Sequence, residues 1–184
     1  VINVDIFRSS IAKSEIVGIF CALNSNGIIL PNISTQEEIQ NFKKIAREND
    51  MSVSVIDSKF TALGNLILCN DSGTILSKLI SQKNKKIIED CLGVESEYCT
   101  TAGLNSVGSC GIATNKGCVL HRDASEKELD KFQNVLHVNS DIGTANFGSP
   151  FIGSCAIANS KGLLVGESTT GPEVTRIMEA LSLL

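Results

Sequence analysis

Residues 107–121 read VGSCGIATNKGCVLH, and residues 152–166 read IGSCAIANSKGLLVG. Two earlier windows follow the same pattern, VGIFCALNSNGIILP over residues 17–31 and LGNLILCNDSGTILS over residues 63–77. Each window holds two glycines nine positions apart, and the first glycines follow one another at 46, 44 and 45 residues (Gly18, Gly64, Gly108 and Gly153). Self-similarity at such a period is typical of folds built from repeated supersecondary units. The sequence therefore predicts four copies of one unit.

Each window predicts a β-hairpin, because two apolar, β-branched runs flank a short turn that ends in glycine. We expect these second glycines to be backbone devices that adopt a left-handed conformation and form a bulge. They are Gly27, Gly73, Gly117 and Gly162.

A helix is expected after each hairpin. Eight residues past the turn glycine stands Thr35, Ser81, Ser125 or Thr170, and a Glu follows three positions later in three of the four copies. This is the pattern of a helix capping box. Apolar residues at spacings of three and four then form one helix face that can cover a sheet. Strand-like stretches follow the first three helices at residues 52–57, 94–98 and 138–143, so the unit is strand, strand, helix, strand.

The predicted fold is α/β, a single repeat domain over residues 1–184 whose units stand around a pseudo-rotational axis. The units span about 16–57, 62–98, 106–143 and 151–184. No third strand follows the last helix, but VINVDIF at residues 1–7 has the same strand pattern. We expect residues 1–7 to complete the fourth unit and close the ring, as the opening strand of a β-propeller does, which would also remove an exposed edge.

Composition narrows the classes of function. The 184 residues are 42% hydrophobic, which is enough for one real core. A net charge of −4 and a pI of about 5.2 argue against broad binding to nucleic acid. Seven cysteines without a CxxC pair make a disulfide framework or a zinc site improbable, and no metal or cofactor is predicted. No apolar run is long enough to span a membrane, so we expect a reduced, cytoplasmic protein.

The repeats argue against two chemical interpretations of the opening stretch. A phosphate loop does not fit, because the glycine spacing differs from G-x-x-x-x-G-K-[ST] and the glycine follows a hairpin turn. A metal or catalytic group of Cys110, Cys118 and His121 is disfavoured, since the position of His121 is occupied in the other copies by Pro31, Ser77 and Gly166. Cys110 and Cys155 share a register that we expect inside strands, where cysteine packs as a small hydrophobe.

The basic run KNKKIIED at residues 83–90 invites an RNA-binding interpretation. It lies within the second predicted helix, and acidic residues accompany its lysines. We therefore interpret it as a solvated helix face.

Four strings stand in order along the chain: TALGNLILCND (61–71), VGSCGIATNKGCVLH (107–121), GTANFGS (143–149) and SKGLLVGESTTGPE (160–173). Together they resemble the translation initiation factor six family of ribosome anti-association factors, most of all its archaeal branch. The resemblance implies a pentein fold and binding to the intersubunit face of the large ribosomal subunit, chiefly through a ribosomal protein next to the sarcin-ricin loop, with limited rRNA contact. A monomeric factor bound there would block joining of the small subunit sterically, without catalysis.

The family's docking surface lies at the rim of the ring, just after the first glycine of several units. Asn65 in ALGN matches the family motif directly, and the corresponding rim positions are Ser109, Cys110, Phe151 and Ile19. The family has five units, whereas this sequence shows four and a leading strand. Either about one N-terminal unit is absent, or a four-unit ring closes in its own way.

Two other classes of function remain open. The pentein architecture also houses guanidine-modifying enzymes that use a Cys nucleophile with a His and acidic groups, and Cys155 with His121 is the pairing that would serve. The third hypothesis is a repeat scaffold for an unrelated partner.

Overall fold

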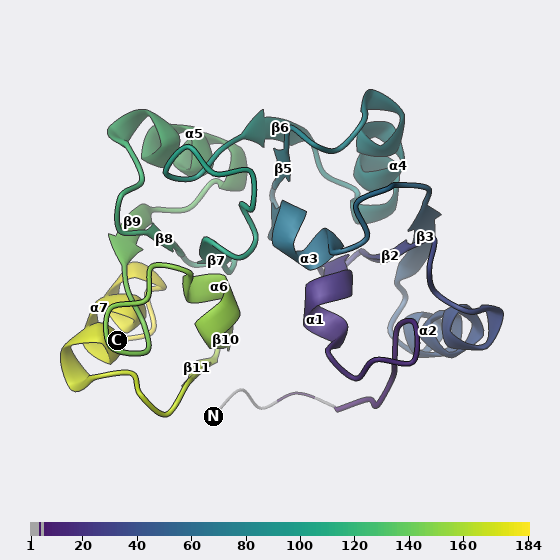
Figure 1. Cartoon of the computed structure of the whole chain (residues 1–184), viewed down its shortest axis with the longest axis horizontal. Helices are drawn as coiled ribbons and strands as arrows, with labels where there is room; N and C mark the ends of the chain where they lie inside the picture. The colour runs from purple at the N-terminus through teal and green to yellow at the C-terminus, as the bar shows by residue number, and fades with distance from the viewer. Residues whose placement is uncertain (1–3, 5) are drawn as a thin grey trace.

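The computed structural model describes Val4 and residues 6–184, which form a mixed α/β structure with four small sheets (Figure 1). The short helices are α1 (Val17–Phe20), α3 (Leu63–Leu66) and α6 (Ile152–Cys155). The longer helices are α2 (Gln36–Glu48), α4 (Gln82–Leu92), α5 (Glu126–Leu136) and α7 (Gly171–Ala180). The strands are β1 (Ala22–Leu23), β2 (Gly27–Pro31), β3 (Ser52–Ile56), β4 (Ile67–Cys69), β5 (Thr74–Ser77), β6 (Ser96–Cys99), β7 (Gly111–Ala113), β8 (Cys118–His121), β9 (Ser140–Gly143), β10 (Ala156–Asn159) and β11 (Gly162–Val165).

The first three sheets share one topology. In each, an antiparallel hairpin is extended by a third strand that runs parallel to the second, in the orders β1-β2-β3, β4-β5-β6 and β7-β8-β9. The pairing is also similar, because the residue directly after each turn glycine, Ile28, Thr74 or Cys118, pairs with Val53, Ser96 or Ser140. With its intervening helix, each sheet has the predicted order of strand, strand, helix, strand.

The fourth sheet is the hairpin β10-β11. The predicted closing strand over residues 1–7 lies partly outside the described residues, which leave out 1–3 and 5. Val4, Ile6 and Phe7 belong to no strand, and their side chains are exposed. The described part of this segment therefore does not close a ring.

The long helices begin at the predicted caps. The side chains of Thr35 and Ser125 accept hydrogen bonds from the N–H groups of Glu38 and Glu128, whose carboxylates accept from the cap N–H groups in return. The N–H of Thr170 donates to Glu173 in the same way. These bonds satisfy donors that a helix start leaves unpaired.

The core is divided among neighbouring units. Three clusters each join a buried hairpin residue of one unit to a strand or short helix and to the long helix of the next. The residues are Ile29 with Leu76 and Ile88, Ile75 with Leu120 and Phe132, and Val119 with Ile152 and Ile177. Each of α4, α5 and α7 thus packs over its own sheet and over the preceding hairpin. The units form an arc with the long helices outside (Figure 1).

The left-handed conformation predicted for the turn glycines is wrong. Gly27, Gly73 and Gly117 have no positive φ. Each instead faces the end of the next unit's helix, where an added Cβ would collide with the carbonyl oxygen of Cys91, Val135 or Ala180. These glycines are structural because their missing side chain allows a helix to approach the hairpin closely.

The first glycine of each window lies in a helical turn, whereas the sequence predicted a strand. Three of these turns are α1, α3 and α6, and the third unit has a turn at residues 107–110. Cys110 and Cys155 accordingly end helical turns and do not lie inside strands. A Cβ on Gly64, Gly108 or Gly153 would collide with the carbonyl oxygen of the preceding glycine in the series, Gly18, Gly64 or Gly108.

We predict that Gly108→Ala lowers the free energy of unfolding by about 1–3 kcal/mol, because the new methyl group would overlap backbone of the neighbouring unit. Gly18→Ala is the matched control, since no described atom outside its own helical turn lies within 4 Å of a Cβ there. In that helical turn the change should be neutral or stabilise by up to about 1 kcal/mol. Equilibrium unfolding in urea measures both, and equal losses would contradict the glycine contact.

Candidate functional site

The sheets have two different ends, one with helical turns and loops and one with the hairpin turns. Each hairpin leaves a helical turn and returns to the same end of its sheet, and the parallel third strand of the first three sheets also ends there. We call this end the rim face. It consists of the helical turns at residues 17–20, 63–66, 107–110 and 152–155 and of the loops that lead into them, 8–16, 57–62, 100–106 and 144–151. The hairpin turns lie at the opposite end.

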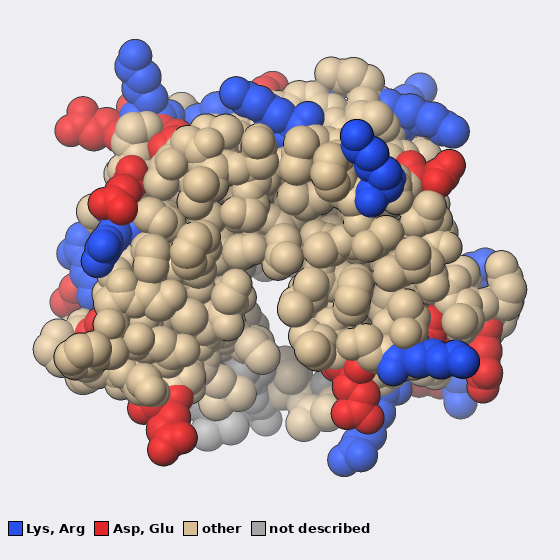
Figure 2. Space-filling view, in the orientation of Figure 1, with Lys and Arg blue, Asp and Glu red and all other residues tan. Residues whose placement is uncertain are grey.

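The rim face exposes several large apolar side chains, whereas the hairpin turns at the opposite end are polar. Exposed large hydrophobic residues on the rim face are Ile16, Ile19, Leu104, Phe147 and Phe151. The hairpin turns present Ser25, Asn26, Asp71, Ser72, Asn115, Lys116, Ser160 and Lys161. With α1, α3 and α6 in the foreground, Figure 2 shows uncharged residues over the middle of the face and charged side chains around its edge. Apolar surface gathered on one face marks an interaction site.

The helical turns surround an opening in the middle of this face. A cavity of about 680 Å³ is lined by residues of all four units, among them Ile19, Asn65, Ser109, Gly153 and Leu164. Figure 2 shows the molecule hollowed at this place. Three of the five predicted binding residues therefore face one shared space.

Asn65 is the predicted residue whose environment argues most for binding. It is half-buried in α3, and its backbone carbonyl accepts a hydrogen bond of 3.0 Å from the N–H of Gly108. Its side-chain amide bonds to no group among Val4 and residues 6–184. The amide of Asn70, by contrast, donates to the carbonyls of Thr114 and Leu136 and accepts from two N–H groups of its own turn. Asn70 serves the fold, while the Asn65 amide is available to a partner.

The other predicted positions are placed differently. Ser109 is half-buried and Ile19 is exposed, both at the opening. Phe151 is exposed at the start of α6, with its ring edge-on to His121 at a centroid distance of 5.6 Å. Cys110 is fully buried, and burial raises the pKa of its thiol, against the smaller effect of a hydrogen bond with Ser106. Its side chain is therefore not presented on the rim face.

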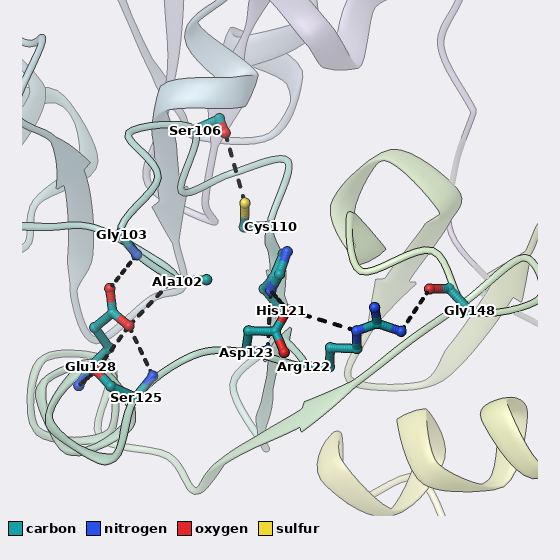
Figure 3. Close-up of polar contacts among 10 residues, drawn as sticks. All are labelled: Ala102, Gly103, Ser106, Cys110, His121, Arg122, Asp123, Ser125, Glu128 and Gly148. Carbon is teal, nitrogen blue, oxygen red and sulfur yellow. Dashed lines mark hydrogen bonds and ion pairs between the residues drawn. The ribbon is translucent and has the colours of Figure 1, made fainter.

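The loops of the rim are held by the same glutamates that cap the helices. Glu38 accepts from the N–H groups of Ala12 and Lys13 and from the hydroxyl of Ser10. Burial alone would raise its pKa, but these bonds and that of the Thr35 N–H lower the pKa to about 2. Glu128 holds its loop likewise through the N–H groups of Ala102 and Gly103 (Figure 3).

Cys155 and His121, the pair nominated for a guanidine-modifying enzyme, have separate hydrogen-bond partners among the described residues. His121 is buried, and its Nδ1 accepts a bond of 3.1 Å from the Asp123 N–H (Figure 3). The Cys155 thiol instead contacts the hydroxyl of Ser149 at 3.6 Å. Within the described part of the chain, His, Cys, Asp and Glu form no group that could hold a metal ion. A search of the same residues finds no helix with the length and apolarity to cross a bilayer.

Comparison with known proteins identifies the class. The model of the eIF-6 family matches residues 1–180, and the chain belongs to this family of translation initiation factors. The protein named translation initiation factor 6 of Pyrococcus horikoshii is 44% identical over 185 residues, and that of Methanococcus vannielii is 44% identical over 187 residues. The one of Pyrococcus abyssi is 42% identical over 186 residues. Each match covers 100% of this chain and 82% of the relative. The resemblance predicted from the sequence is confirmed.

Two features of the rim face escaped the sequence analysis. The capping glutamates were recognised, but their second role depends on loops 25 to 28 residues away along the chain. Phe147 lies in a quoted string, GTANFGS, without having been singled out. Aligning the loops on the glutamate that holds them would have found it, since this alignment places Phe147 with Ala12 and Ala102.

We predict that Glu38→Gln lowers the free energy of unfolding by about 1.5–3 kcal/mol at pH 7, because several hydrogen bonds to a carboxylate are lost. The folded-state pKa of about 2 lies below the usual 4.5, so this stabilisation is complete above pH 4.5 and disappears as the pH falls toward 2. Unfolding curves at pH 7, 4 and 2.5 measure the difference between the two proteins. A difference that stays constant over this range would contradict the assignment.

Proposed function

We propose that this protein binds the large ribosomal subunit through the rim face and prevents premature association with the small subunit. Membership of the eIF-6 family supports a role in translation initiation. The observation that carries the docking surface is the concentration of exposed apolar side chains and of the Asn65 amide on one face, whose charged side chains lie mainly around its edge. A protein bound to the intersubunit surface would block joining of the small subunit sterically, without catalysing a reaction.

The charge pattern favours a protein component of the subunit as the main contact. The chain carries a net charge of −4, and the middle of the rim face lacks the cations that neutralise phosphates. Ribosomal proteins carry basic tails, so complementary contact with a weakly acidic factor is favourable. We therefore expect the partner to be the ribosomal protein next to the sarcin-ricin loop, with limited contact to rRNA.

We infer further that the four sheets form part of a pentein-type propeller. The repeated strand order and the packing of each helix over the preceding hairpin support this architecture. The proposal describes a monomeric cytoplasmic factor that needs no cofactor and no catalytic group. Separate hydrogen-bond partners for Cys155 and His121 support the non-enzymatic role over a guanidine-modifying enzyme.

We predict that Asn65→Asp weakens binding to purified large subunits at least about fivefold, while stability stays within about 0.5 kcal/mol. Phe132→Ala is the opposite control, because its side chain is fully buried and its loss should cost about 3–5 kcal/mol. Below its unfolding temperature this variant should still bind.

Co-sedimentation with large subunits, and joining assays with small subunits, measure the two effects. A wild-type protein that neither sediments with large subunits nor reduces joining would refute the proposed function. Equal stability losses in the two variants would refute only the surface position of Asn65.

A further inference from the structure

Three rim loops each contain a tight turn, and the turn of the fourth unit is one residue longer than the other two. Isolated antiparallel bridges close the turns between Ile11 and Ser14, Thr101 and Leu104, and Ala145 and Ser149. In each turn two successive N–H groups donate to the carboxylate of the capping glutamate. The first donor of each pair is Ala12, Ala102 or Phe147, so these three residues correspond in their bond to the glutamate, although the longer turn places Asn146 as an additional residue before Phe147.

Phe147 departs from its equivalents in a way that the fold does not require. All three residues adopt a positive φ, 51° for Ala12, 52° for Ala102 and 61° for Phe147. For a bulky side chain such a conformation is uncommon, and alanine makes the same bond to the glutamate in the two shorter turns. The Phe147 side chain is moreover 83% exposed, so it stabilises no core. An aromatic group that is both strained and exposed points to a role outside the fold.

The turn that carries Phe147 is firmly held. Glu173 accepts from the N–H groups of Phe147 and Gly148 at 3.2 and 2.7 Å, and Thr169 accepts from the N–H of Asn146. The Asn146 side chain packs so closely on Gly166 that a Cβ there would overlap it. Because the backbone of the turn is held, little backbone freedom would be lost when the ring binds a partner.

The surroundings of Phe147 are electrostatically neutral. Arg122 donates to the Gly148 carbonyl, and its Nε lies 3.7 Å from an oxygen of Asp123 (Figure 3). Arg176 pairs with Asp141 at 2.6 Å. Since both arginines beside the neighbouring groove pair with carboxylates of this chain, the patch offers phosphate groups little net attraction. Phe147 therefore suits an apolar pocket on a protein better than nucleic acid or an anionic membrane surface.

We propose that Phe147 is an anchor residue that inserts into an apolar pocket on a folded protein partner. Buried aromatic anchors dominate the energy of many protein interfaces. Phe147 lies on the rim face together with Asn65, so the inference rests on the proposed function. The inference adds a contact made by the fourth unit, and it specifies that Phe147 contacts a protein component of the large subunit.

The test compares Phe147→Ala with the wild-type protein in binding to purified large subunits. Affinity should fall at least about tenfold, with little dependence on salt. The melting temperature should stay the same or rise, because alanine already occupies the equivalent turns. Leu184→Ala is the matched control, since this side chain is 75% exposed but lies away from the rim loops, and its affinity should not change. Phe147→Tyr should retain most of the affinity.

The partner class is tested by replacing Phe147 with the photoreactive p-benzoylphenylalanine and irradiating the complex. Crosslinks to a ribosomal protein support the inference, and crosslinks to rRNA alone overturn it. If the wild type and Asn65→Asp behave as proposed but Phe147→Ala binds like the wild type, only the anchor is wrong. If the wild type does not bind large subunits, both proposals fail.

Discussion

The contact on which the rest of the structure depends is the approach of one unit's backbone to a glycine of its neighbour. It occurs twice at each junction between units, once near the rim and once at the hairpin turn. Gly108 meets the carbonyl of Gly64 near the rim, and Gly73 meets that of Val135 at the end of α5. Only residues without a Cβ allow both approaches, and both are needed for the helix to cover the preceding hairpin. The period of about 45 residues is thus the sequence trace of a packing constraint between units.

That constraint explains which parts of the fold could be predicted. Hairpins, capping boxes and helix faces are patterns that a sequence shows directly. Thr35 and Ser125, for example, marked the starts of two helices. The role of Gly117 could not be predicted, because a glycine in a turn signals either a left-handed backbone or a close neighbour. Only the position of the Ala180 carbonyl decides between them. The four-residue helices α1, α3 and α6 were missed because so short a segment shows no helical periodicity.

The residues of the candidate site likewise differ in whether the sequence or only the structure identifies them. Asn65 was found through family resemblance, and the structure adds that its amide is not used by the fold, unlike that of Asn70. Cys110 was nominated because it follows Gly108 by two positions, but the helical turn directs its thiol into the core. Phe147 stands out only when hydrogen bonds to Glu173 align its loop with Ala12 and Ala102. A repeated sequence is therefore most informative once the structure shows which residues of the copies correspond. A residue that differs from its counterparts in the other copies can then be recognised.

The same comparison shows that the hairpins of the units differ in burial. Leu68 and Ile75 of the second sheet are buried against the third unit, but the equivalent Ile157 and Leu164 of the fourth sheet are 68% and 56% exposed. In repeat architectures stability is largely a sum of contacts between neighbours, so units flanked on both sides are the firmest. Asn65 and Ser109 stand on these two inner units, whereas Ile19 and Phe147 stand on the outer ones. The loop of Phe147 is fixed locally by bonds to Glu173, as the loop of Ala102 is by bonds to Glu128, and additionally by the bond from the Asn146 N–H to Thr169.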